Sequence, residues 1–270
     1  MPMITSDHKT ALDALTDWWE GAGVHVDRKE IDKLIRNANQ AAPVTQLHGG
    51  GTTARKKAEP DHVAKAKALA GAADTLEALQ DALTRFDGCE LKMLAQHTVF
   101  ADGAVDADVM VIGEGPGRDE DEQGIPFVGK AGHLLDRMLA SIGLSRETNA
   151  YITNVNFWRP PGNRNPTDDE LAMCRPFVDR HIALKKPKLI IVTGAVPAKA
   201  LLDVNDGIMK LRGKKYDFTL PDSAQKVPLF PIFHPAYLLR RPAEKARAWQ
   251  DLQQILLEMK KLGIAPDKRP

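Results

Sequence analysis

Short apolar runs alternate with amphipathic segments along the second half of the chain. Four runs rich in β-branched residues predict buried strands: ADVMVIG (107–113), AYITNV (150–155), PKLIIVTG (187–194) and VPLFPIFH (227–234). The spacing of apolar residues predicts helices at 134–144, 167–184, 196–203 and 242–262. This alternation favours a three-layer α/β/α fold in which a mostly parallel, four-stranded central sheet lies between helices.

The N-terminal part of the chain follows a different pattern. Residues 8–37 have the apolar spacing of helices, whereas 40–60 are rich in Gly, Thr, Ala and Lys and show no apolar period. A helical pattern resumes over 61–86. We therefore expect a helical N-terminal extension and flexible linker at 1–60, followed by a folded domain at 61–270.

The composition is that of a soluble globular protein. Apolar residues make up 43% and charged residues 27% of the chain, which is enough apolar material for a sizeable core. No apolar run reaches the length of a membrane span, and the first residues lack the apolar segment of a secretory signal. Because the chain has only two cysteines, Cys89 and Cys174, we expect a cytoplasmic protein without disulfides.

Each predicted strand is followed by a loop with chemically distinctive residues. The loops are GEGPG, TNVNFWRPP, TGAVP and HPAYLL, in chain order. The carboxyl ends of parallel strands meet at one edge of a sheet, and ligands bind there. The sequence therefore predicts a functional site where these four loops come together.

The first loop combines glycines with an acidic run. The backbone at Gly115 can approach a ligand closely because glycine has no Cβ, and residues 119–122 place carboxylates beside it. A dinucleotide site fits poorly, since the glycine spacing differs and no helix is predicted directly afterwards. Gly124–Lys130 matches the spacing of a phosphate-binding loop, but Ala131 stands where that motif needs Ser or Thr. A turn with solvated acidic residues remains the alternative.

Two polar side chains stand at the ends of later strands. Asn154 offers one acceptor and two donors, so its amide can pair with an imide edge such as that of uracil. His234 could donate to an oxygen that gains negative charge as a base departs. Ordinary turn and helix-capping roles remain open for both residues. No second His or Cys stands at ligand spacing from His234, so we expect no metal there.

Charge is unevenly distributed along the chain. The formal net charge is only +1, but residues 159–247 contain 17 Lys and Arg against 9 Asp and Glu. Such a basic half could cover the phosphates of a nucleic acid, with an ordinary solvated surface as the alternative.

Taken together, these loops resemble the uracil-DNA glycosylase superfamily, and its family 4 most closely. The matching stretches run in order between about residues 86 and 256: VIGEGPGRDEDEQGIPFVGKAGHLLDRML, YITNVNFWRPPGNRNPTDDE, IIVTGAVPAKALL, KLRGKKYDF and FHPAYLLRRP. The resemblance implies a DNA repair enzyme that flips uracil out of DNA and hydrolyses its N-glycosidic bond, leaving an abasic site.

The resemblance also implies roles for particular residues. Glu114 and Glu120 match the acidic positions of the first motif, and we favour Glu120 as the carboxylate that positions the water. Phe127 matches the aromatic residue that stacks on the flipped base, Asn154 the amide that recognises uracil, and His234 the catalytic histidine. Gly115 is expected in the substrate-binding loop beside them.

The segment after His234 is expected to contact DNA. By resemblance, Leu238, Leu239 and Arg240 supply a wedge that fills the gap left by the flipped base. The basic residues of the segment could bind phosphates: Arg240, Arg241, Lys245 and Arg247. Arg212, Lys214 and Lys215 have a similar but weaker case.

One feature of family 4 is missing from this sequence. Its members hold a 4Fe–4S cluster with four cysteines, and such clusters normally need four thiolates. Here Cys89 and Cys174 match the second and fourth positions, whereas Phe86 and Trp158 occupy the first and third. We therefore expect no iron–sulfur cluster and no other cofactor, with Cys89 and Cys174 as remnants of the cluster site.

Two other functions remain open at this point. The missing cysteines and the N-terminal extension would also fit a catalytically weak DNA-binding or damage-sensing protein of the same fold. A glycosylase for hypoxanthine or xanthine is the second alternative. A related branch of the superfamily crosslinks to DNA through a basic loop inserted after the position of Asn154. Here the stretch WRPPGNRNPTDDE runs on without an insertion, so we do not expect crosslinking. We expect a monomer that binds single- or double-stranded DNA, with a repair partner possible through the N-terminal segment.

Overall fold

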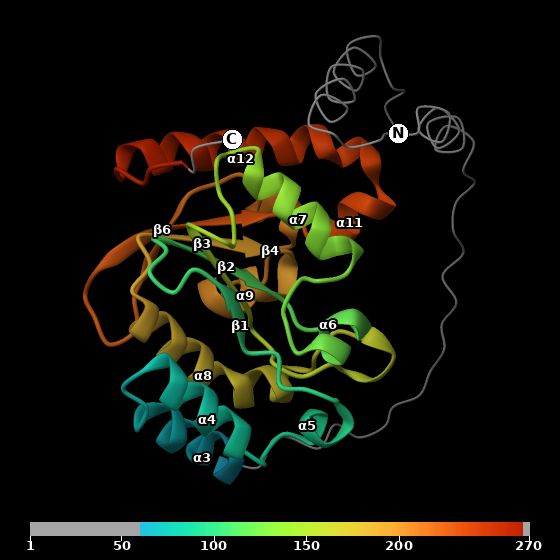
Figure 1. Ribbon diagram of the computed structural model, residues 1–270, viewed down its shortest axis with the longest axis vertical. Helices are drawn as coiled ribbons and strands as arrows, with labels where there is room; N and C mark the ends of the chain where they lie inside the picture. The colour runs from blue at the N-terminus through green and yellow to red at the C-terminus, as the bar shows by residue number, and fades with distance from the viewer. Residues whose placement is uncertain (1–59, 267–270) are drawn as a thin grey trace.

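The computed structural model describes residues 60–266, which form a six-stranded sheet between two layers of helices (Figure 1). The strand order is β1-β3-β2-β4-β6-β5. The four central strands run parallel to one another: β2 (Val109–Gly113), β3 (Ala150–Asn154), β4 (Leu189–Thr193) and β6 (Lys226–Ile232). These are the four predicted strands, so the predicted three-layer fold with its parallel core is confirmed.

Two edge strands were absent from the prediction. β1 (Ala101–Gly103) and β5 (Tyr216–Thr219) pair antiparallel with β3 and β6. They have only three and four residues, and most of these are half-buried or exposed. Strands of this kind lack the continuous apolar run by which the central strands are recognised.

The helices divide between the two faces of the sheet (Figure 1). One layer holds α8 (Asp168–Lys185) and α9 (Ala195–Leu202), with α3 (Pro60–Gly71) and α4 (Leu76–Arg85) packed against α8. The other holds α7 (Lys130–Ala140), α11 (Pro235–Arg240) and α12 (Lys245–Lys261).

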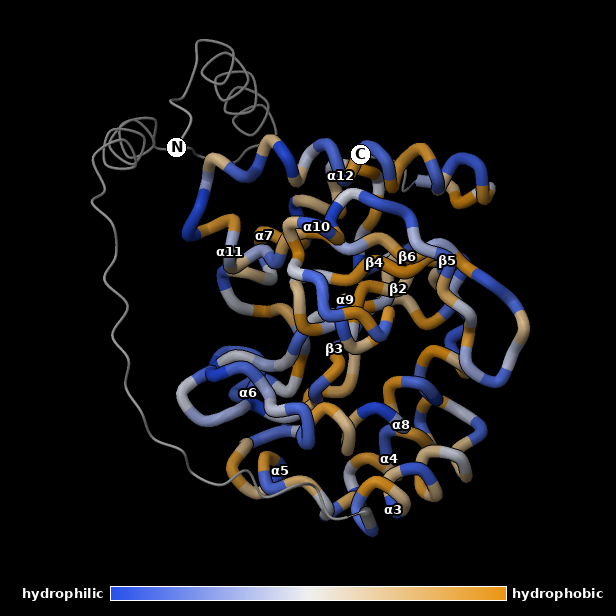
Figure 2. Tube along the Cα trace, turned by 180° about the vertical axis from the view of Figure 1, so that it is seen from behind, coloured by the Kyte–Doolittle hydropathy of each residue, from blue (hydrophilic) through white to orange (hydrophobic). Residues whose placement is uncertain are grey.

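Alternate strand residues supply the two apolar cores. In β2, Met110 and Ile112 belong to the core beneath α8, whereas Val109 and Val111 belong to the core beneath α7 and α12. Figure 2 shows the hydrophobic residues gathered on the strands, with the α6 region mainly hydrophilic. Burial on both faces explains why these strands are continuously apolar.

Several short helices complete the domain: α5 (Glu90–Leu94), α6 (Arg118–Gln123), α10 (Ile208–Leu211), η1 (Pro161–Asn163) and η2 (Pro242–Glu244). The expectation that no helix follows the glycine loop was wrong, because α6 begins directly after Gly117. The Glu120 side chain accepts a hydrogen bond from the Gly117 N–H and so caps this helix. A six-residue helix with acidic residues in its first turn has no apolar period to reveal it.

The helical pattern predicted for 61–86 is confirmed as α3 and α4. The extension and linker expected at 1–60 lie almost wholly outside the described residues. In the described part of the chain, no helix is long and apolar enough to cross a membrane.

Candidate active site

A pocket of about 510 Å³ opens at the carboxyl edge of the parallel strands. It brings together seven of the residues singled out from the sequence: Glu114, Gly115, Glu120, Phe127, Asn154, His234 and Arg240. They come from the loops after β2 and β3 and from the junction of β6 with α11. The predicted meeting of loops therefore exists, although the loop after β4 does not line this pocket.

The floor of the pocket depends on the close approach of β2 and β3. Gly113 and Asn154 face each other as the last registered pair of the two strands. A Cβ atom at Gly113 would lie 2.4 Å from Asn154 Oδ1 and 2.5 Å from the Phe127 ring. Only glycine therefore allows the amide and the ring to occupy these positions together.

Asn154 presents an unsatisfied acceptor. Its side chain is 1% exposed, and within the described residues its Oδ1 has no hydrogen-bond partner. Buried side-chain oxygens are nearly always paired, so an orphan in a pocket wall marks a place for a donor. A ligand with an N–H group in the plane of the amide would satisfy it.

Phe127 and His234 form the aromatic part of the pocket. Their ring centroids are 5.9 Å apart with an interplanar angle of 29°. Phe127 is 6% exposed and has a left-handed backbone, with φ at 55°, which is rare for a residue other than glycine. Such a ring face suits the stacking of a planar base.

His234 has a defined proton position. Its Nδ1 accepts a hydrogen bond of 3.1 Å from the Ala236 N–H in the first turn of α11, which leaves the ring proton on Nε2. Burial, with a smaller contribution from the Arg240 charge, lowers the pKa of His234 to about 4. The imidazole is therefore neutral near pH 7 and acts as an N–H donor.

The two candidate carboxylates differ in their partners. Glu120 accepts three backbone hydrogen bonds, from Gly117, Val128 and Gly129, at 3.0, 3.0 and 2.9 Å. Glu114 makes no such bond within the described residues, and burial raises its pKa. Glu120 thus joins two loop segments, whereas Glu114 is the carboxylate with free lone pairs in the pocket.

The predicted DNA-contacting segment separates into exposed and buried residues. Leu239 is 44% exposed and Arg240 and Arg241 are exposed, but Leu238 is 1% exposed and packs in the core between β6 and α7. Leu238 lies on the side of α11 that packs on the core, and Leu239, about 100° further round the helix, lies on its exposed side. The expectation that Leu238 reaches DNA is therefore corrected. Lys245, another residue expected to contact DNA, is half-buried, and burial lowers its pKa.

The second basic stretch also differs from expectation. The Arg212 side chain is 15% exposed and forms two hydrogen bonds with the Asp251 carboxylate, at 2.9 and 2.5 Å. Lys215 pairs with Glu258 at 3.1 Å. Arg212 therefore joins α10 to α12, and Lys214 is the residue of this group that stays exposed without an ion pair in the described structure.

The positions that match cluster ligands form an apolar, aromatic core. Phe86 and Trp158 are both 0% exposed and their rings lie 6.4 Å apart, and Phe86 also contacts Phe177 at 5.4 Å. Cys89 and Cys174 are buried free thiols, and burial raises the pKa of Cys89 to about 11. Among the described residues no group of three or more His, Cys, Asp or Glu side chains could hold a metal. These residues do not fit a cluster that needs four thiolates.

The structure adds pocket residues that the sequence analysis did not single out. The loop around η1 contributes Pro160, Asn163 and Arg164, and Arg164 is held by two hydrogen bonds to Glu170, at 2.8 and 2.6 Å. The proline- and glycine-rich run RPPGNRNP was the sequence signal that could have indicated this loop.

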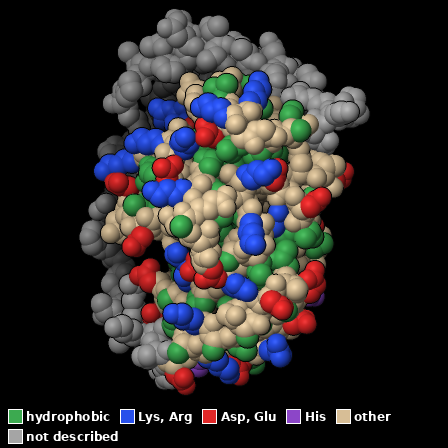
Figure 3. All heavy atoms as spheres, turned by 90° about the vertical axis from the view of Figure 1, so that its left-hand side faces the viewer, with side chains coloured by type: hydrophobic (Ala, Val, Ile, Leu, Met, Phe, Trp, Pro, Cys, Tyr) green, Lys and Arg blue, Asp and Glu red, His purple; other side chains and the backbone are tan. Residues whose placement is uncertain are grey.

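The face at the left of Figure 1, away from α6 and α11, shows interspersed positive and negative side chains (Figure 3).

The chain resembles known proteins over most of the described region. Residues 100–253 match the profile of the uracil DNA glycosylase superfamily. The type-4 uracil-DNA glycosylase of Sulfurisphaera tokodaii is 34% identical over 200 residues, which cover 72% of this chain and 88% of that protein. The type-4 enzyme of Archaeoglobus fulgidus is 39% identical over 171 residues, covering 62% and 84%, and that of Thermotoga maritima 35% over 193, covering 70% and 97%.

Fold, pocket and comparisons agree on the class: the chain belongs to the uracil-DNA glycosylase superfamily. The relatives are type-4 enzymes, so the resemblance to family 4 predicted from the loops is confirmed. The comparisons therefore support an enzyme of this superfamily over a catalytically weak DNA-binding protein of the same fold.

The contact at Gly113 gives a first prediction. Substituting Gly113→Ala should lower the rate of base excision by about 100-fold, because Asn154 or Phe127 must move by about 1 Å to admit the methyl group. Single-turnover cleavage of a uracil-containing oligonucleotide measures the rate. Gly71→Ala is the matched control, since a Cβ there meets nothing within 4 Å. Full activity of Gly113→Ala would show that the close approach is unimportant.

Proposed function

We propose that this uracil-DNA glycosylase binds a flipped uracil between Phe127 and Asn154 and hydrolyses its N-glycosidic bond. The orphan acceptor Asn154 Oδ1 is the observation that carries the proposal. Uracil presents N3–H as a donor beside O4 as an acceptor, and a side-chain amide pairs with both. Cytosine presents the opposite pattern at these positions, so the same amide disfavours it.

Cleavage of the bond requires stabilisation of two developing charges. The departing base becomes negative, and the Nε2–H of a neutral His234 can donate to its O2. The sugar becomes positive, and a carboxylate near it lowers the energy of that state. We assign this second role to Glu114, since the Glu120 oxygens already accept three backbone N–H groups. This assignment departs from the preference for Glu120 that the sequence alone suggested.

DNA contacts are proposed for the exposed residues near the pocket mouth. Arg240 lines the pocket and Arg241 follows it, so both could hold phosphates on either side of the flipped nucleotide. Leu239 is the apolar side chain exposed on α11, and we propose it as the wedge in place of Leu238. Cytoplasmic location, a monomeric state and a repair partner for the N-terminal segment stay predictions.

We further propose that the enzyme works without an iron–sulfur cluster. The aromatic contacts of Phe86 and Trp158 supply the packing that the cluster would otherwise provide. Protein purified without oxygen should contain no stoichiometric iron and show no broad visible absorbance, yet excise uracil. Stoichiometric iron that is lost together with activity on chelation would contradict this proposal.

The roles of Asn154 and His234 give a second prediction. Substituting either residue by Ala should lower the single-turnover rate on uracil-containing DNA by about 100-fold or more, because each removes a hydrogen bond made at the reacting base. The affinity for undamaged DNA should change little, since neither residue is assigned to the phosphates. Equal losses of rate and affinity would contradict the assignment.

Matched oligonucleotides that contain uracil, hypoxanthine or xanthine test which base the enzyme excises. Absence of product from all three would favour a damage-sensing protein.

The half-buried carboxylate of Glu114 gives a third prediction, about pH. Partial burial raises the pKa of Glu114 above its ordinary value, so the carboxylate is protonated at a higher pH than an exposed Glu. The excision rate should fall together with the carboxylate form as pH is lowered. His234 has a pKa of about 4 and stays neutral over that interval. Glu114→Gln should lower the rate and remove this acid limb, while Glu77→Gln on the exposed side of α4 should preserve it. An unchanged limb in Glu114→Gln would assign the titration to another group.

A further inference from the structure

The stacking residue Phe127 needs external support. Its backbone lies in the left-handed region with φ at 55°, and it stands in a connection between α6 and α7. Residues with a Cβ rarely adopt this conformation unless the surrounding structure enforces it. The groups that hold the backbone of Phe127 therefore decide where its ring lies.

Arg146 provides one side of that support. It stands in the connection between α7 and β3, and its guanidinium donates to two successive carbonyls, from Nη1 to Pro126 O at 3.0 Å and from Nη2 to Phe127 O at 2.8 Å. The side chain is 17% exposed. A planar guanidinium can hold two adjacent acceptors in a fixed geometry, which a flexible ammonium group cannot do.

Two carboxylates orient the guanidinium. Asp102 of β1 accepts from Nη1 at 2.9 Å, and Asp136 of α7 accepts from Nε at 2.9 Å and pairs with Nη2 at 2.8 Å. All three nitrogens of Arg146 thus have protein partners. The short edge strand β1 contributes to this arrangement, because it carries the Asp102 carboxylate that contacts Nη1.

The opposite side of the segment is held by Glu120 and α7. Glu120 Oε1 accepts from the N–H groups of Val128 and Gly129, which directly follow Phe127. In the first turn of α7, a Cβ at Gly132 would lie 1.8 Å from Phe127 O, so the helix packs directly on this carbonyl. The backbone is therefore held at its carbonyls by Arg146 and at its amides by Glu120.

We propose that Arg146, oriented by Asp102 and Asp136, is a positioning residue that presets the Phe127 ring for the flipped base. Arg146 acts through the backbone of Phe127 and is absent from the pocket lining. The inference rests on the stacking role of Phe127 in the proposed function. The ion pairs of Arg146 with Asp102 and Asp136 would then serve the reaction as well as the stability of the fold.

A double-mutant cycle tests whether Arg146 acts through Phe127. Arg146→Lys should lower the single-turnover excision rate by about 10-fold in the otherwise unchanged enzyme, because a displaced ring stacks less well. In the Phe127→Ala background the same substitution should change the rate by less than about 2-fold. An equal loss in both backgrounds would overturn the proposal, since that is the signature of a merely structural arginine.

Inhibition by free uracil supplies a second readout. The inhibition constant should rise both in Arg146→Lys and in Phe127→Ala, while the affinity for undamaged DNA should stay constant. Asp102→Asn keeps the arginine and removes one orienting charge, so it should show the same pattern with a smaller loss. An unchanged inhibition constant in both Arg146→Lys and Asp102→Asn would overturn the proposal even if rates fell.

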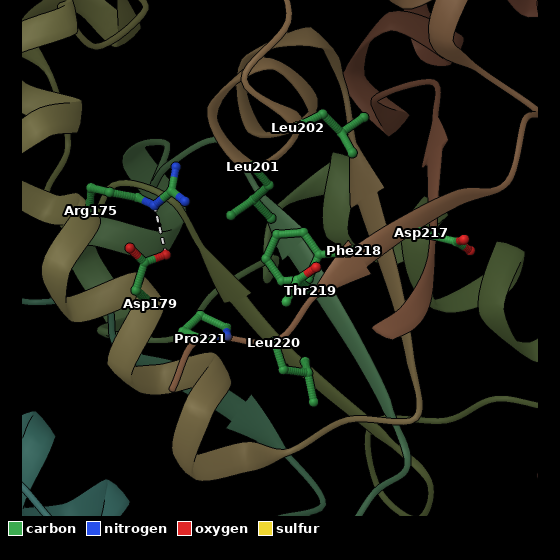
Figure 4. A pocket seen from close by; sticks show the side chains of 9 residues that line it. All are labelled: Arg175, Asp179, Leu201, Leu202, Asp217, Phe218, Thr219, Leu220 and Pro221. Atoms are coloured by element: carbon green, nitrogen blue, oxygen red, sulfur yellow. Dashed lines mark hydrogen bonds and ion pairs between the residues drawn. The ribbon is translucent and has the colours of Figure 1, made fainter. Parts of the chain in front are cut away.

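Arg175→Lys is the matched control. Arg175 also pairs with a carboxylate, that of Asp179, and donates to a backbone carbonyl, that of Ala200, but on the α8 side of the sheet beside a second pocket (Figure 4). The single-turnover excision rate of Arg175→Lys should stay within about 2-fold of that of the unsubstituted enzyme. If Phe127→Ala itself retains full activity, the stacking role fails. If Phe127→Ala is impaired but Arg146→Lys is not, only the inference about Arg146 fails.

Discussion

The site depends on the absence of a side chain at one strand end. Gly113 closes β2 directly opposite Asn154 of β3, and an added Cβ would meet both the Asn154 amide and the Phe127 ring. Parallel pairing brings the two strand ends to the same height, and glycine lets the groups that follow them converge. The amide edge and the aromatic face that a flipped base requires are thereby held within one pocket.

Around this contact the polar side chains divide by the partners that they bond. Glu120 and Arg146 hold the loop that bears Phe127: Glu120 accepts from backbone N–H groups, and Arg146 donates to two backbone carbonyls while Asp102 and Asp136 orient it. The Glu114 carboxylate accepts no hydrogen bond within the described residues, and His234 retains an Nε2–H, so both groups are available to a ligand in the pocket. Such a division lets a site be both rigid and reactive, because preorganised groups need not rearrange as charge develops.

The sequence predicted the parts of the protein with strong local patterns. The four central strands are buried on both faces and therefore continuously apolar, and the pocket residues lie in loops with distinctive chemistry. Leu238 was misassigned because only the three-dimensional direction of α11 decides which leucine faces outward. The support by Arg146 was invisible, since its partners Asp102 and Asp136 meet it only through the pairing of β1 with β3 and the packing of α7. Long-range contacts among common charged residues leave no local signal.

The most direct test of the account is whether the pocket recognises an imide N–H through Asn154. Free uracil and 3-methyluracil can each be tested as competitors of a uracil-containing oligonucleotide. Neither free base is cleaved, so their inhibition reports recognition by the pocket alone. We expect uracil to inhibit the enzyme and methylation at N3 to abolish inhibition, because Oδ1 then loses its donor; Asn154→Ala should bind neither compound measurably. Equal inhibition by the two compounds in the unsubstituted enzyme would show that the pocket does not recognise the N3–H group.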